Sequence, residues 1–165
     1  YTLSLHDALP ISNLTGSYMG SYGLSSMLFA LILTLYTSKK IINRKKIHLW
    51  SLIAGGIGFI SMYFISNHNL LLISFSLIGI SWGSILSMPY AMLSSSVKEE
   101  SMGTSMGIFN MFIVIPQIIA AIGGINLLTN LIGDKVIFSM VVAGLSLIIA
   151  GLLNLLINDK KTISY

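Results

Sequence analysis

The sequence contains no cysteine and few charged residues. Without cysteine the chain has no disulfide framework, no thiolate metal site and no cysteine nucleophile. Charged residues make up 8% of the chain and hydrophobic residues 55%, whereas about 25% of a typical soluble domain is charged. Such a small number of polar side chains cannot cover a soluble surface, so the composition indicates a protein that lies in a lipid bilayer.

The sequence also lacks the residue patterns of enzymes and metal sites. It has no His-x-x-x-His pair and no Gly-rich loop that ends in Lys-Ser or Lys-Thr. Lys and Arg occupy short gaps between hydrophobic stretches and not one polar face, which argues against nucleic-acid binding. His48 and His68 lie at the edges of hydrophobic stretches and are expected to be solvated. We therefore expect no enzyme activity, no cofactor and no metal.

Residues 1–12 are set apart from the rest of the chain. Their sequence, YTLSLHDALPIS, matches one reading frame of a common short-read sequencing adapter residue for residue. We interpret this segment as an assembly artefact and exclude it, with a genuine short N-terminal segment as the alternative. On this interpretation residues 13–165 belong to a protein that continues upstream.

Five hydrophobic stretches follow, each long enough for a membrane-spanning helix. They cover approximately residues 17–36, 47–66, 70–93, 104–128 and 136–157. About 20 apolar residues in a helix cross a hydrocarbon core of about 30 Å, and none of these stretches contains Asp, Glu, Lys or Arg. Because polarity does not alternate along them, they predict helices and not barrel strands. The expected fold is an all-α polytopic membrane protein with five transmembrane helices.

The basic residues lie almost entirely on one side of the predicted membrane. The gaps on that side contain Lys39, Lys40, Arg44, Lys45, Lys46, Lys98, Lys160 and Lys161, and the other side contains Lys135 alone. Short loops rich in Lys and Arg face the cytoplasm. The asymmetry therefore predicts a cytoplasmic C-terminus.

Small residues recur at the spacing of helix–helix contacts. Three pairs of glycines are separated by three residues, and further glycines cluster in the second stretch. These residues are Gly16 and Gly20, Gly79 and Gly83, Gly103 and Gly107, and the cluster Gly55, Gly56 and Gly58. Small side chains let helix backbones approach closely in lipid. We expect these glycines to lie where helices pack against each other.

A few polar and aromatic side chains inside the stretches are candidates for a functional site. Asn110 and Gln117 are seven residues apart, which places them on one helical face. Amides at this depth either bond a neighbouring helix or face a polar cavity, and both roles stay open. Trp82 and Tyr90 have amphipathic rings suited to a sugar, although Trp82 could equally fill the interior of the bundle.

Two prolines accompany these side chains. Pro89 directly precedes Tyr90, and Pro116 directly precedes Gln117. A proline frees a backbone carbonyl one turn earlier and kinks the helix, and broken helices near the midplane often line transport sites. Pro89 and Pro116 are therefore predicted helix kinks.

The segments around these residues resemble a known family. Segment 79–90, GISWGSILSMPY, is similar to the tenth helix of bacterial major facilitator superfamily sugar:cation symporters of the sucrose/maltose type. Segment 106–118, MGIFNMFIVIPQI, is similar to the eleventh helix of the same group. The resemblance covers roughly residues 16–157, so that the five stretches correspond to helices eight to twelve.

The resemblance implies a secondary transporter in a bacterial inner membrane that moves a sugar together with a cation, expected to be a proton, by alternating access. Such transporters have two six-helix halves. The chain would be part of the C-terminal six-helix bundle, and its partners would be the sugar, the cation, membrane lipid and the missing N-terminal half. Trp82, Tyr90, Asn110 and Gln117 would bind substrate. The chain alone would not transport.

A basic segment also resembles the family, with one departure. Lys39, Lys40, Arg44, Lys45 and Lys46 are similar to its cytoplasmic loop between helices eight and nine. Ile42 and Asn43 stand where a Gly before the Arg is usual. Because Asn tolerates a left-handed conformation, the turn can be kept.

Two other classes of function remain open on the sequence. A small membrane scaffold or assembly subunit would need its five charge-free helices only to pack. A membrane-embedded enzyme is the weaker alternative because no catalytic pair is present. The DNA upstream of residue 13 distinguishes a transporter from a scaffold. A transporter predicts further spans in frame, whereas a scaffold predicts a nearby start codon.

Overall fold

The computed structural model describes residues 5–37, 42–124 and 136–157, and these residues form helices and short connections without any strand. The helices in chain order are α1 (Leu5–Thr37), α2 (Arg44–Ser61), α3 (His68–Ser94), the short 3-10 helix η1 (Glu99–Ser101), α4 (Met102–Ile119), the π-helical turn η2 (Ala120–Gly124) and α6 (Val136–Asn154). Each of the five hydrophobic stretches overlaps one long helix. The all-α fold expected from the sequence is confirmed.

Four of these helical stretches are long and apolar enough to cross a membrane. They cover Ser12–Thr37, His68–Ser94, Glu99–Gly123 and Ile137–Asn154. The fifth long helix, α2, has 18 residues, and its first three residues are basic. It therefore begins and ends a few residues earlier than the predicted span 47–66. Its length is about 27 Å, close to the thickness of a hydrocarbon core. α1 begins at Leu5, inside the segment 1–12 whose origin stays a prediction.

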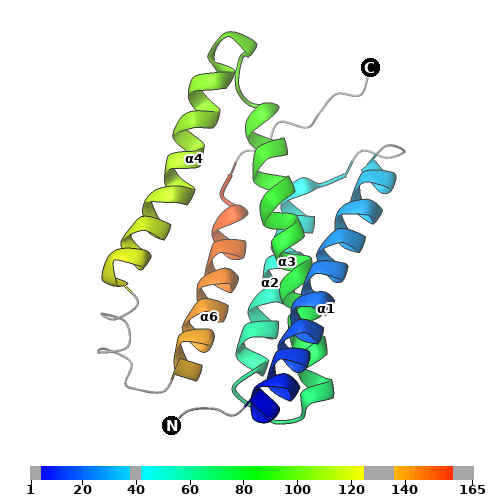
Figure 1. The fold of residues 1–165 in the computed structure, drawn as a ribbon. Coiled ribbons are helices and arrows are strands. Elements are labelled where there is room, and N and C mark those ends of the chain that lie inside the picture. Colours follow the sequence, from blue (N-terminus) through cyan, green and yellow to red (C-terminus); the bar gives the residue numbers. More distant parts are fainter. Residues whose placement is uncertain (1–4, 38–41, 125–135, 158–165) are drawn as a thin grey trace.

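Four helices lie side by side in the order α1, α3, α2, α6 (Figure 1). α3 packs against both α1 and α2, and α2 packs against α6 on its other side. α4 follows α3 through η1 and diverges from it along its length (Figure 1). Within the described ranges α4 makes no extensive contact with the other long helices and buries none of its residues.

The interior between these helices is made of small and polar residues. Among the residues that the structure describes, the buried large hydrophobic side chains are Leu52, Met88 and Met92. The buried polar residues are Arg44, His48, Ser51, Ser74, Ser81, Ser84 and Asn154. Large side chains such as Leu31, Phe112 and Ile149 point outward instead. This arrangement suits a lipid solvent, in which close packing of small residues holds helices together and apolar side chains face the acyl chains.

Glycines allow the close approach at these interfaces, but only some of the predicted ones lie there. A Cβ on Gly79 would meet Tyr22 O and Ser25 Oγ of α1, and a Cβ on Gly56 would lie 2.7 Å from Gly144 O of α6. In contrast, a Cβ on Gly16, Gly20, Gly103 or Gly107 would meet nothing within 4 Å. For these four glycines the predicted contact is absent among the described residues.

The fourth predicted span is interrupted before its expected end at Leu128. The α-helix ends at Ile119 and continues as the π-helical turn η2, in which Gly123 has φ of 149°. This φ lies outside the helical region and is accessible to glycine because it lacks a Cβ. The remainder of the predicted span, residues 125–128, lies outside the described residues.

Candidate functional site

Two of the predicted site residues are joined by a hydrogen bond between α3 and α4. The hydroxyl of Tyr90 donates to Asn110 Oδ1 over 2.6 Å. The ring of Tyr90 also packs edge to face on Phe109, with centroids 4.9 Å apart. The tyrosine thus contacts one α4 side chain through its ring and the next through its hydroxyl, as expected of an amphipathic side chain.

Trp82 and Gln117 lie farther along the same two helices. Because α3 and α4 run in opposite directions from their shared connection (Figure 1), both residues lie on the same side of the Tyr90–Asn110 bond. Trp82 is about 12 Å from Tyr90 along α3, and Gln117 is about 10 Å from Asn110 along α4. The two side chains are exposed, Trp82 to 42%. They are therefore at similar depth but are not in the hydrogen-bonded pair.

The two prolines lie inside continuous helices. Pro89 is within α3 and Pro116 within α4. Neither can donate to the carbonyl one turn earlier, so the carbonyls of Ile85 and Phe112 lose their usual helical partner. The π-helical turn η2 begins four residues after Pro116. A kink at either proline stays a prediction.

The basic segment begins α2 instead of forming only a loop. Arg44, Lys45 and Lys46 make up the first turn of α2. Asn43 has φ of −84° and ψ of 92° and caps this turn by accepting a hydrogen bond from Lys46 N. Asn43 therefore does not take the left-handed conformation that the sequence left open, because it has the extended conformation of a helix N-cap. Lys39 and Lys40, like Lys135, Lys160 and Lys161, lie outside the described residues.

Arg44 connects the beginning of α2 to the end of α3. Its Nη1 donates to Ala91 O over 2.6 Å, and its Nη2 donates to Ser95 Oγ over 3.0 Å. The side chain is almost completely covered, with 9% of its surface exposed. A cation among the last carbonyls of a helix is favourable because that end carries partial negative charge.

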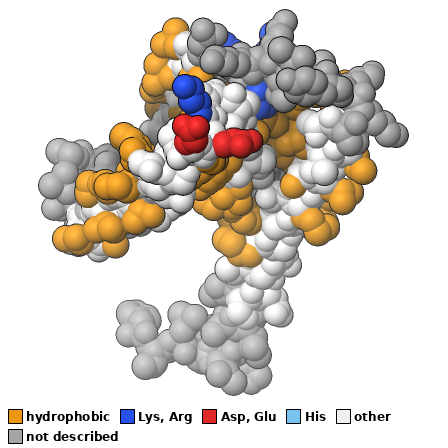
Figure 2. Space-filling view, turned by 90° about the horizontal axis from the view of Figure 1, so that it is seen from above, with side chains coloured by type: hydrophobic (Ala, Val, Ile, Leu, Met, Phe, Trp, Pro, Cys, Tyr) orange, Lys and Arg blue, Asp and Glu red, His pale blue; other side chains and the backbone are white. Residues whose placement is uncertain are grey.

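Lys45 makes the corresponding connection to α6. Its Nζ donates to Leu155 O and Ile157 O over 3.2 and 2.8 Å, and Asn154 Nδ2 donates back to Lys45 O over 2.9 Å. The start of α2 therefore holds the ends of α3 and α6 together. Figure 2 looks onto this end of the molecule, where basic and acidic side chains gather between flanks of hydrophobic side chains.

His48 is a buried residue that the sequence placed incorrectly at a solvated edge. It has 7% of its surface exposed, and its Nδ1 lies 2.8 Å from Ser84 Oγ of α3. The reason is that α2 begins at Arg44, so His48 lies in the second turn of the helix and faces α3. The Asn43 cap was the sequence signal that could have located this start. His68, in contrast, is exposed as expected and lies 3.1 Å from the hydroxyl of Tyr18.

The sequence was compared with family models, with curated proteins and with solved structures. The family model described as Major Facilitator Superfamily matches residues 3–164. Neither the curated proteins nor the solved structures give a match. The family match covers nearly the whole chain and agrees with the apolar helices of the structure. The chain therefore belongs to the major facilitator superfamily, whose members are membrane proteins that act as secondary transporters of small molecules.

Proposed function

We propose that the chain is the C-terminal part of a sugar transporter in which α3 and α4 line the substrate cavity. The observation that carries the proposal is the Tyr90–Asn110 hydrogen bond. It brings together two residues from the two segments that resemble the tenth and eleventh helices of the sucrose/maltose-type symporters. Trp82 and Gln117 extend the same pair of helices at similar depth.

These side chains have the chemistry that a sugar requires. A phenol and two amides donate and accept hydrogen bonds, and an indole ring can stack on the apolar face of a pyranose. In a site shielded from water, a hydroxyl left without its partner costs free energy, so such groups discriminate between sugars. Asn110 would exchange its bond with Tyr90 for one with a substrate hydroxyl.

The coupling cation is proposed to be a proton, and its carboxylate site is proposed to lie on helices supplied by the rest of a longer chain. No Asp or Glu lies within α1, α2, α3 or α4 between residues 12 and 119. Such a longer chain would also cover α4, which has no buried residue among those described. Alternating access would then occur by movement of the two six-helix halves around the shared site.

Substrate binding by the amides is tested by uptake measurements on the complete transporter that contains this chain. Asn110→Ala and Gln117→Ala are each expected to raise the KM for sugar, by up to about tenfold, because each removes a hydrogen-bond partner. Phe112→Leu is the matched control, because residue 112 lies on the opposite side of α4 from Asn110 and is exposed. Its KM should stay unchanged.

Tyr90→Phe separates substrate binding from helix packing. If Asn110 only bonds α3, Tyr90→Phe and Asn110→Ala should lower thermal stability equally and leave the KM unchanged. That outcome, together with an unchanged KM in Gln117→Ala, would show that Asn110 and Gln117 contribute to helix packing and not to substrate binding. A change in KM without a matching loss of stability supports the proposed site.

We also propose that the end of the molecule with the basic residues faces the cytoplasm of a bacterium. Arg44, Lys45 and Lys98 lie at this end, and residues 61–68 form the connection at the opposite end. Because the chain has no cysteine, single cysteines report location without interference. In intact cells an impermeant maleimide should label Ser66→Cys but not Ser96→Cys. After permeabilisation it should label both variants. Labelling of both variants in intact cells would contradict this orientation.

A further inference from the structure

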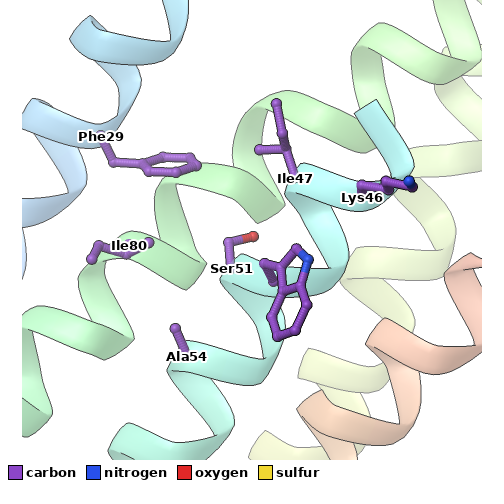
Figure 3. A pocket seen from close by; sticks show the side chains of 7 residues that line it. Phe29, Lys46, Ile47, Ser51, Ala54 and Ile80 are labelled. Atoms are coloured by element: carbon purple, nitrogen blue, oxygen red, sulfur yellow. The ribbon is translucent and has the colours of Figure 1, made fainter. Parts of the chain in front are cut away.

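An open groove lies between α1, α2 and α3 near the basic end of the molecule (Figure 3). Its volume is about 500 Å³. Residues from all three helices line it, with most of them from the first three turns of α2. They are Phe29, Lys46, Ile47, Trp50, Ser51, Ala54 and Ile80. The groove is distinct from the residues proposed to bind sugar, because Trp82, Tyr90, Asn110 and Gln117 are not among its lining residues.

The groove is apolar except at one end. The Ser51 hydroxyl donates to His48 O over 2.8 Å, so its hydrogen is not available to a ligand. The other lining side chains besides Lys46 are aliphatic or aromatic. An occupant must therefore be apolar along its length, because a polar group inside would lose its hydrogen bonds to water without replacement.

Lys46 is the one charged side chain among the described residues that line the groove. Arg44 and Lys45, its neighbours, direct their side chains to the ends of α3 and α6. Among the residues that the structure describes, the Lys46 ammonium has no hydrogen-bond or ion-pair partner. It lies in the first turn of α2, nearest the basic end, and is exposed. An anionic group at this end of the groove would complement it.

The dimensions of the groove match one leaflet of a bilayer. Lys46 and Ala54 are eight residues apart on α2, which corresponds to about 12 Å. Half of a hydrocarbon core of about 30 Å is about 15 Å. Trp50, with 67% of its surface exposed, lies one turn from Lys46, where an indole is favourable at the boundary between headgroups and acyl chains.

We propose that this groove binds a phospholipid with an anionic headgroup from the leaflet at the basic end. One acyl chain lies between Phe29 and Ala54, and the phosphate of the headgroup is paired with Lys46. The indole of Trp50 covers the part of the acyl chain that is nearest the headgroup. The lipid thus fills the open space that is lined by Phe29 of α1 and Ala54 of α2.

The proposal is tested by tryptophan quenching on the full chain in vesicles. Trp82→Phe leaves Trp50 as the sole tryptophan, since the chain has two. Brominated phosphatidylcholine quenches Trp50, and unbrominated phosphatidylglycerol or phosphatidylcholine is added as competitor. We expect phosphatidylglycerol to bind about fivefold more tightly, the factor for about 1 kcal/mol from one lysine near the surface.

Three variants in this background decide whether the groove is responsible. Lys46→Gln should abolish the preference for phosphatidylglycerol, whereas Lys98→Gln, at the same end but outside the groove, should keep it. Ala54→Phe fills the groove without changing any charge and should also abolish it. A preference that survives Ala54→Phe would show attraction by surface charge alone and overturn the proposal. Equal effects of the two lysine variants, or Trp50 shielded from every brominated lipid, would overturn it as well.

Discussion

Gly79→Ala and Gly56→Ala are each expected to lower the stability of the helix bundle, whereas Gly20→Ala and Gly107→Ala are not. A Cβ on Gly79 would meet the carbonyl oxygen of Tyr22, and a Cβ on Gly56 would lie 2.7 Å from the carbonyl oxygen of Gly144. Backbone oxygens cannot rotate away, so the helices must separate. Overpacking of this kind costs about 1–3 kcal/mol.

Where the glycine faces open space, the same substitution is not expected to lower the stability of the bundle. A Cβ on Gly20 or Gly107 would meet nothing within 4 Å. Alanine is the better helix former by about 1 kcal/mol, so these two variants should be neutral or slightly more stable. All four positions are helical glycines, which makes the controls equal in chemistry and different only in neighbours.

The measurement is thermal unfolding of the purified chain and its variants in detergent. The two interface variants should unfold at lower temperature than the parent, and the two open-face variants at the same or a higher temperature. If all four variants behaved alike, the α1–α3 and α2–α6 contacts described here would not be the ones that hold the bundle together.

Arg44→Gln is expected to cause the second large loss of stability. The guanidinium donates to Ala91 O and Ser95 Oγ, and hydrogen bonds from a charged donor contribute about 1.5–3 kcal/mol. Glutamine is too short to reach both acceptors. Arg44→Lys should recover only part of the loss, because an ammonium keeps the charge near the end of α3 but lacks the planar fork.

Lys98→Gln is the matched control for this prediction. Lys98 lies at the same end of the molecule but is exposed, and removal of an exposed charge changes stability by less than about 0.5 kcal/mol. Thermal unfolding and hydrogen exchange of the amides after Ala91 measure the effect. An Arg44→Gln protein as stable as Lys98→Gln would show that the connection between α2 and α3 does not depend on this side chain.

The positions of the long helices were predictable because hydropathy is a property of consecutive residues. The stretch 70–93 became α3 (His68–Ser94), and 136–157 became α6 with a final turn. Boundaries were less accurate where capping decides them. At α2 the Asn43 side chain starts the helix before the apolar run begins, which moved Arg44 into the helix and His48 into the interface.

The candidate site was predictable residue by residue but not as a pair. Polar side chains inside apolar stretches are conspicuous in a sequence, so Tyr90 and Asn110 were both selected. That the Tyr90 hydroxyl reaches Asn110 depends on the direction in which α4 leaves α3 after the turn at residues 95–101. No periodicity within either helix contains that information.

The sequence by itself determined that this protein is a set of apolar helices in a membrane and, through its family match, a secondary transporter. Only the tertiary structure decided which glycines are contacts and which basic side chains are engaged. Gly79 and Gly107 have the same local setting, and so do Arg44 and Lys46. They differ only in the distant segment that packs against them, because close packing and hydrogen bonding depend on neighbours in space.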